Sequence, residues 1–196
     1  MGILSRHIQK VRIRACVPFV RGDVLDLGCG DARILGLGGE RIKSYCGVEF
    51  EPAHSEKLRG RFPQHTFFAA NLEEDNFPFE TMFDTVLMIA LIEHIRNAER
   101  LIEQALSRLK PSGRIVITTP TPLGDRIHTI GAHLGLFARS AIEHHVKIYS
   151  KSDLEALAHR FNLKIEQYRT FEFGCNQLLV LTTKGGTGKK EEWPEA

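Results

Sequence analysis

The feature that most constrains the fold is an alternation between short apolar runs and helically spaced apolar residues, from Asp23 to Thr118. Short apolar runs bounded by turn signals are typical of buried strands, whereas apolar residues at three- and four-residue intervals indicate helices. The expected strands are 24–27, 44–49, 66–69, 83–88 and 114–118, and the expected helices are 32–37, 53–60 and 98–109. Such alternation predicts an α/β fold with a mostly parallel sheet covered by helices on both faces.

The chain before this alternation is expected to form one amphipathic helix. Residues 3–16 place apolar side chains on one face and basic side chains elsewhere. A helix of this kind either packs on the domain or contacts an anionic membrane surface or substrate. We assign residues 1–18 to this N-terminal segment.

A long insertion, residues 119–149, follows the expected fifth strand. It contains prolines, glycines and several histidines, and ligands of open α/β sheets bind beyond the carboxyl ends of the strands. We therefore expect it to shape an acceptor pocket or a lid. Ser150 and Asp153 then form a capping-box pattern that starts a helix, with strands at 163–168 and 178–182. A single domain over 1–184 and a polar tail over 185–196 follow.

Composition places few other demands on the chain. The net charge is only +2, which does not require a nucleic-acid partner. The four cysteines are scattered without CxxC spacing, so we expect reduced thiols, and no metal site is expected either. No apolar run approaches the ~20 residues of a membrane span, and the N-terminus lacks an apolar signal sequence. The chain is expected to be cytoplasmic, with peripheral membrane contact left open and the oligomeric state undetermined.

A two-glycine turn follows the first expected strand in Asp26-Leu27-Gly28-Cys29-Gly30. Glycines let the backbone turn tightly and approach a ligand closely. A dinucleotide fingerprint would need a third small residue where Arg33 stands, and the carboxylate of Asp26 would repel a pyrophosphate. The same carboxylate would favour an ammonium group. The turn thus favours a ligand with an amino-acid end over one with phosphates.

Residues after the next strands extend this expected ligand site. Glu49 ends the second strand, where an acid can accept both hydroxyls of a ribose, and Phe50 could lie against a base. Asn71 and Leu72 follow the third strand and could read the edge of the base. The full expected cofactor set is Asp26, Gly28, Cys29, Gly30, Glu49, Phe50, Asn71, Leu72, Met88 and Ile89.

These segments together resemble class I S-adenosylmethionine-dependent methyltransferases, of the type that acts on small molecules, lipids and glycans. Residues 24–30 resemble their first motif, Val48-Glu49 their second, and Leu109 to Arg114 their Leu-Lys-Pro-Gly-Gly turn. The resemblance implies S-adenosylmethionine as cofactor and a Rossmann-like seven-stranded sheet of order 3-2-1-4-5-7-6 with strand 7 antiparallel. Asn71 departs from the family pattern, which often has Asp there.

Two histidines are candidates for catalysis. The segment from Glu143 to Ser150 resembles a [DE]-H-x-x-x-[FY]-[ST] segment of these methyltransferases, and His145 matches its histidine. Histidine can remove a proton near neutral pH, so His145 is a candidate to orient or deprotonate the acceptor. His94 follows the fourth strand and could face the same pocket. Both could instead have structural roles.

The expected activity is methyl transfer, mainly to oxygen, on a small-molecule, lipid-linked or glycan acceptor. Two alternatives remain open at this point. One is a non-catalytic partner subunit that binds the cofactor, and the other is a nucleic-acid methyltransferase. The second is disfavoured because residues 88–91 contain no proline after the fourth strand, no cysteine lies between Cys46 and Cys175, and no basic footprint is evident.

Overall fold

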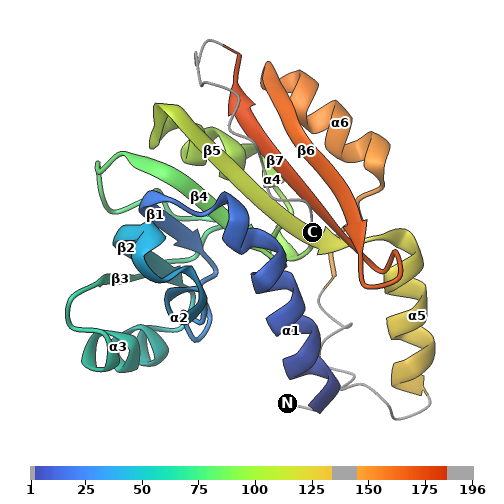
Figure 1. The fold of residues 1–196 in the computed structure, drawn as a ribbon, viewed down its shortest axis with the longest axis horizontal. Helices are drawn as coiled ribbons and strands as arrows, with labels where there is room; N and C mark the ends of the chain where they lie inside the picture. The colour runs from blue at the N-terminus through green and yellow to red at the C-terminus, as the bar shows by residue number, and fades with distance from the viewer. Residues whose placement is uncertain (1–2, 134–144, 185–196) are drawn as a thin grey trace.

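The computed structural model describes residues 3–133 and 145–184. These residues form one seven-stranded sheet with helices on both faces (Figure 1). The helices are α1 (Ile3–Cys16), α2 (Ile34–Gly38), α3 (Pro52–Arg61), α4 (Ala98–Ser107), α5 (Pro122–His133) and α6 (Lys151–Arg160). The strands are β1 (Gly22–Leu27), β2 (Ile42–Glu49), β3 (Thr66–Ala69), β4 (Phe83–Ile89), β5 (Leu109–Pro120), β6 (Leu163–Phe171) and β7 (Asn176–Thr183).

The strand order is β3-β2-β1-β4-β5-β7-β6, and β7 runs antiparallel to both of its neighbours. The other paired strands run parallel. Both the order and the antiparallel seventh strand confirm the prediction from the sequence. The order reverses direction at β1 and β4, so the carboxyl ends of these two strands border the crevice where open α/β sheets bind ligands.

Successive residues of the central strands face two separate hydrophobic cores. Leu25 packs with α4 and α6 on one side of the sheet, whereas its neighbour Val24 packs with α1, α2 and α3 on the other. Strands that are buried on both faces read as continuous apolar runs, because each side chain finds a core whichever way it points. This is why the strands of the sheet could be located from the sequence.

Residues 119–149 are partly helical, which the sequence analysis did not predict. Helix α5 begins at Pro122, and Thr121 caps it by accepting a hydrogen bond from the Gly124 backbone N–H at 3.0 Å. Gly124 lies against the backbone of Cys175 so closely that a Cβ there would be 1.9 Å from its carbonyl oxygen. Thr followed by Pro at the first helical position was the available signal. Residues 134–144 lie outside the described residues.

Element boundaries differ from the prediction in two further places. Helix α2 begins at Ile34 rather than Ala32, because Ala32 has a φ of 52°, in the left-handed region. The expected turn at 110–113 lies within β5, where the register jumps from the pair Phe83–Leu109 to the pair Thr85–Arg114. The residues of β5 between these two pairs form an irregularity in the strand. The expected turn is therefore present, and β5 still pairs with β4 on both sides of it.

Candidate active site

The glycine turn between β1 and α2 is held against two neighbouring strands. Gly28 and Gly30 have φ angles of 69° and 50°, which favour glycine. The backbone N–H groups of Gly28 and Cys29 both donate to the Val48 carbonyl oxygen, at 2.9 and 3.1 Å. A Cβ at Gly28 would be 3.0 Å from Leu91, whereas at Gly30 the nearest such atom is 3.9 Å away. The turn is therefore packed on one side and open at Gly30, where a ligand can approach.

Asp26 lies beneath this turn rather than on its surface. Only 3% of the residue is exposed, and its carboxylate accepts a hydrogen bond of 2.7 Å from the Tyr45 hydroxyl. Burial raises the pKa of Asp26 to about 7, partly offset by the hydrogen bond from Tyr45. The sequence analysis did not identify Tyr45. A contact between Asp26 and a ligand ammonium group stays a prediction.

Glu49, at the end of β2, lies beside Gly30 at the open side of the turn. One carboxylate oxygen accepts a hydrogen bond of 2.8 Å from Gly30 N–H, and the other accepts one of 3.0 Å from Phe50 N–H. The Phe50 side chain beside it is 69% exposed. A half-buried carboxylate next to an exposed aromatic ring suits a ligand with neighbouring hydroxyls and a planar base.

The remaining expected cofactor residues have mixed environments. The Asn71 side chain accepts a hydrogen bond from Glu73 N–H at 3.1 Å, so its carbonyl oxygen already stabilises a turn. Three of them are buried in the hydrophobic cores: Leu72, Met88 and the Cys29 thiol. Ile89, at the end of β4, is half-buried. Met88 can therefore meet a ligand only through its backbone.

A second polar group lies beyond the carboxyl end of β4. His94 belongs to the 3-10 turn Ile92–His94, which follows β4, and His145 belongs to the segment that precedes α6. The centres of their rings are 5.0 Å apart, so the structure brings these two candidate residues together. The His145 ring is anchored by Asp125 of α5, with 2.9 Å between Nδ1 and the carboxylate.

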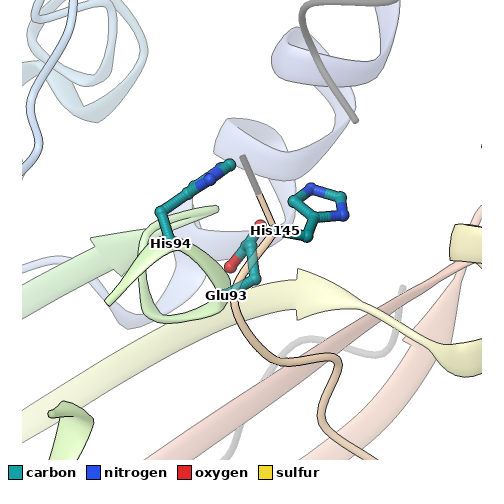
Figure 2. Close-up of side chains that lie close together, drawn as sticks. All are labelled: Glu93, His94 and His145. Carbon is teal, nitrogen blue, oxygen red and sulfur yellow. The ribbon is translucent and has the colours of Figure 1, made fainter. Parts of the chain in front are cut away.

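Glu93 completes this group, and its backbone carbonyl holds the segment that carries His145. That carbonyl oxygen accepts hydrogen bonds from the N–H groups of Val146, at 2.7 Å, and Lys147, at 3.2 Å. The Glu93 side chain is fully buried and points toward the two histidines (Figure 2). Neither Glu93 nor Asp125 was singled out from the sequence, because nothing local marks them as neighbours of His145.

The comparison with known families decides the assignment. Residues 4–168 match the family model described as a methyltransferase domain. The chain belongs to this family. It carries a class I S-adenosylmethionine-dependent methyltransferase domain, a domain whose cosubstrate is S-adenosylmethionine. The opening at Gly30, the Glu49 carboxylate and the exposed Phe50 ring fit the ribose and adenine of that molecule.

Curated relatives match over part of their length. A Mycobacterium tuberculosis protein named "Probable S-adenosylmethionine-dependent methyltransferase" is 28% identical over 119 residues, covering 59% of this chain and 42% of the relative. The ubiquinone biosynthesis O-methyltransferase of Rickettsia prowazekii is 27% identical over 135 residues, covering 60% and 50%. This methyltransferase thus aligns with half or less of the length of these relatives.

Solved structures share the fold at low identity. Magnesium protoporphyrin IX methyltransferase from Synechocystis, solved with bound SAH, superposes with a TM-score of 0.69 at 14% identity, covering 94% of this chain and 89% of that one. An S-adenosylmethionine-dependent methyltransferase from Mesorhizobium loti gives a TM-score of 0.67 at 18% identity, covering 86% and 94%. No helix within the described residues has the length and apolar character needed to cross a bilayer.

Proposed function

We propose that this methyltransferase transfers the methyl group to a hydroxyl oxygen of a small organic acceptor with a large apolar part, such as a lipid-linked phenol. S-adenosylmethionine supplies a methyl carbon activated by its sulfonium. The observation that carries the proposal is the hydrogen bond between His145 and Asp125 at the carboxyl end of the sheet. Histidine oriented by a carboxylate can position a hydroxyl and assist loss of its proton.

The apolar part of the acceptor is inferred from exposed apolar side chains on α5, beside His145 and in the turn between β6 and β7. Leu123 and Ile127 of α5 are 52% and 43% exposed, Val146 beside His145 is 50% exposed, and Phe173 is fully exposed. Leu123 adjoins Gly174, the neighbour of Phe173, and exposed apolar surface is typical of sites that bind apolar ligands or membranes. The names of two relatives, a ubiquinone biosynthesis O-methyltransferase and a demethylmenaquinone methyltransferase, are consistent with quinone-like acceptors.

A groove between α1 and α2 supports an amphiphilic acceptor as well. It has a volume of about 460 Å³. Its lining residues are His7, Lys10, Ile13, Arg33, Gly36 and Leu37. Basic and apolar side chains together suit an anionic headgroup that is attached to an apolar chain. The contact of the first helix with an anionic surface or substrate, one of the two alternatives left open from the sequence, would use this groove.

Methyl transfer to a matched panel of acceptors tests the proposal. The panel contains a polyprenyl-substituted phenol, the same phenol without the chain, a sugar and a carboxylic acid, each incubated with methyl-labelled S-adenosylmethionine. We expect labelled methyl ether on the polyprenyl phenol and at least tenfold slower transfer to the short phenol. The control is the polyprenyl phenol with its hydroxyl already methylated. Label on carbon or nitrogen, preference for the sugar, or binding of SAH without transfer to any acceptor would contradict it.

A further inference from the structure

Three potential metal ligands come together at the carboxyl end of β4. Glu93 and His94 are adjacent in the 3-10 turn, and His145 arrives from the segment before α6 (Figure 2). One ligand atom from each residue lies within 4.8 Å of the other two. Ligand atoms on a single ion lie about 3–4 Å apart, because each is about 2.1 Å from the ion. Small side-chain rotations would therefore bring the three into a coordinating arrangement.

The Glu93 carboxylate is an unusual group to find at this position. The residue is fully buried, and neither side-chain oxygen has a hydrogen-bond partner within residues 3–133 and 145–184. A buried carboxylate without a partner is strongly destabilising, because nothing replaces the water it has lost. Arg12 lies close enough to Glu93 that this negative charge partly offsets the lowering of the Arg12 pKa by burial. The Nε of Arg12, however, donates its hydrogen bond to the Asn176 side chain, at 2.7 Å. A bound cation would neutralise Glu93 by direct contact.

The hydrogen bond to Asp125 prepares His145 as a ligand. An ionised carboxylate can only accept hydrogen bonds, so Nδ1 of His145 donates to it, and in the neutral ring Nε2 is the nitrogen with a free lone pair. Metal-bound histidines commonly donate their other ring nitrogen to a carboxylate in this way, which fixes both the tautomer and the ring orientation. Asp125 therefore occupies the place of a supporting residue behind a metal ligand.

We propose that Glu93, His94 and His145 bind one divalent transition-metal ion, with Asp125 orienting His145. Two imidazole nitrogens and one carboxylate are a ligand set used by zinc and other first-row transition ions, and it leaves positions open for a substrate. Magnesium and calcium favour sites made of oxygen atoms. The sequence analysis expected no metal site, because the ligands come from segments far apart in the chain.

The ion defines the acceptor more closely, and this step rests on the proposed function. An acceptor oxygen on the ion has a lowered pKa, so its proton is released to solvent. That oxygen then bonds to the methyl carbon while the carbon–sulfur bond breaks and its electron pair stays on sulfur. Acceptors with two neighbouring oxygens, such as catechols or vicinal diols, could fill two open positions. His145 is then a positioning residue that acts through the ion.

Cobalt binding to the purified full chain tests the site without cofactor or acceptor. After removal of metals with EDTA and dialysis, Co²⁺ is added while its visible absorption and calorimetric heat are followed. We expect about one ion per chain, displaced by Zn²⁺. The variants Glu93→Gln, His94→Gln and His145→Gln should each weaken binding by at least about tenfold, and Asp125→Asn by about tenfold. His159→Gln, on the exposed surface of α6, is the matched control and should bind like wild type.

Two binding outcomes would overturn the metal site, besides the activity result given below. One is no Co²⁺ binding by the wild type, and the other is equal affinity in His145→Gln and His159→Gln. Circular dichroism checks folding, and His145→Gln alone decides the result if Glu93→Gln does not fold. Failure of every acceptor despite tight Co²⁺ binding would contradict only the proposed function. Normal methyl transfer by metal-free protein would contradict only the metal proposal.

Discussion

The proposed cofactor end and the proposed acceptor end of the crevice are built in different ways. At the cofactor end, Asp26, Gly28, Gly30 and Glu49 lie on two adjacent strands and the turn between β1 and α2, and hydrogen bonds join them directly to their neighbours. At the acceptor end, the polar residues come from a 3-10 turn, α5 and the segment before α6. The first end is a continuous motif, whereas the second is assembled from distant segments.

This difference indicates how the fold separates binding of the cofactor from specificity for the acceptor. A glycine turn and an acid at the end of the next strand can be supplied by any sequence that keeps the β1–α2–β2 unit. The acceptor end depends on the exact placement of an inserted segment, which can vary without disturbing the sheet. Changes at the two ends should therefore affect different measurable quantities.

The largest expected effect concerns the pH dependence of stability, through Asp26. Its folded-state pKa is about 7 and its ordinary value is 3.8. The unfolded chain loses this proton first, so the free energy of unfolding should fall between about pH 4 and pH 7, by roughly 4 kcal/mol at most, and then level off. Urea unfolding of wild type and Asp26→Asn across this range measures the contribution.

Asp26→Asn should lack this fall. Tyr45→Phe should extend it to higher pH, because the Tyr45 hydrogen bond lowers the pKa of Asp26. Parallel pH profiles for wild type and Asp26→Asn would show that the carboxyl group is not held protonated by burial, and the buried character of the cofactor end would need revision.

The next largest effect is expected at the acceptor end. His145→Ala should lower kcat by about 100-fold or more, because the proposed positioning of the acceptor and the loss of its proton both depend on this side chain, and such contributions reach factors of this size. The affinity for S-adenosylhomocysteine should not change, since His145 lies apart from the Glu49 side of the crevice. Steady-state kinetics and calorimetry measure the two quantities. His159→Ala serves as the control, and an equal loss of cofactor affinity in His145→Ala would break the separation between the two ends.

Glu49→Ala tests the cofactor end, where the affinity for S-adenosylhomocysteine is expected to change. Loss of a charged acceptor for two ribose hydroxyls should weaken S-adenosylhomocysteine binding by about 10- to 100-fold. Calorimetric titration gives the dissociation constant. Glu51→Ala, an exposed acid at the start of α3, is the control and should keep the wild-type affinity. Unchanged binding in Glu49→Ala would remove the assigned ribose contact.

The smallest effect, a change in stability, is expected from one glycine within the turn and one in the helix that follows it. Gly28→Ala should lower the free energy of unfolding by about 1–2 kcal/mol, because a side chain at a φ of 69° is strained and its Cβ would meet Leu91 at 3.0 Å. Gly36→Ala, in α2 with open space around it, should instead raise stability by about 0.5–1 kcal/mol. Urea denaturation compares the two, and equal effects would show that the conformation of the turn is not restrictive.

The sequence by itself determined the fold class, and it predicted where the cofactor binds. Strands such as β1 and β4 are buried on both faces, so their apolar runs are visible without any knowledge of neighbours. The two-glycine turn and Glu49 carry their signal in their own spacing.

Tertiary structure alone decided which side chains meet at the acceptor end. Asp125 reaches His145 only because α5 is placed at the end of β5, and Tyr45 reaches Asp26 only because β1 and β2 pair in one register. Contacts between segments far apart in the chain depend on packing, which no local pattern of residues records. This is the physical reason why the sequence could predict the glycine turn, Glu49 and the two histidines as candidates, but not the partners Tyr45, Glu93 and Asp125 that they meet in the folded chain.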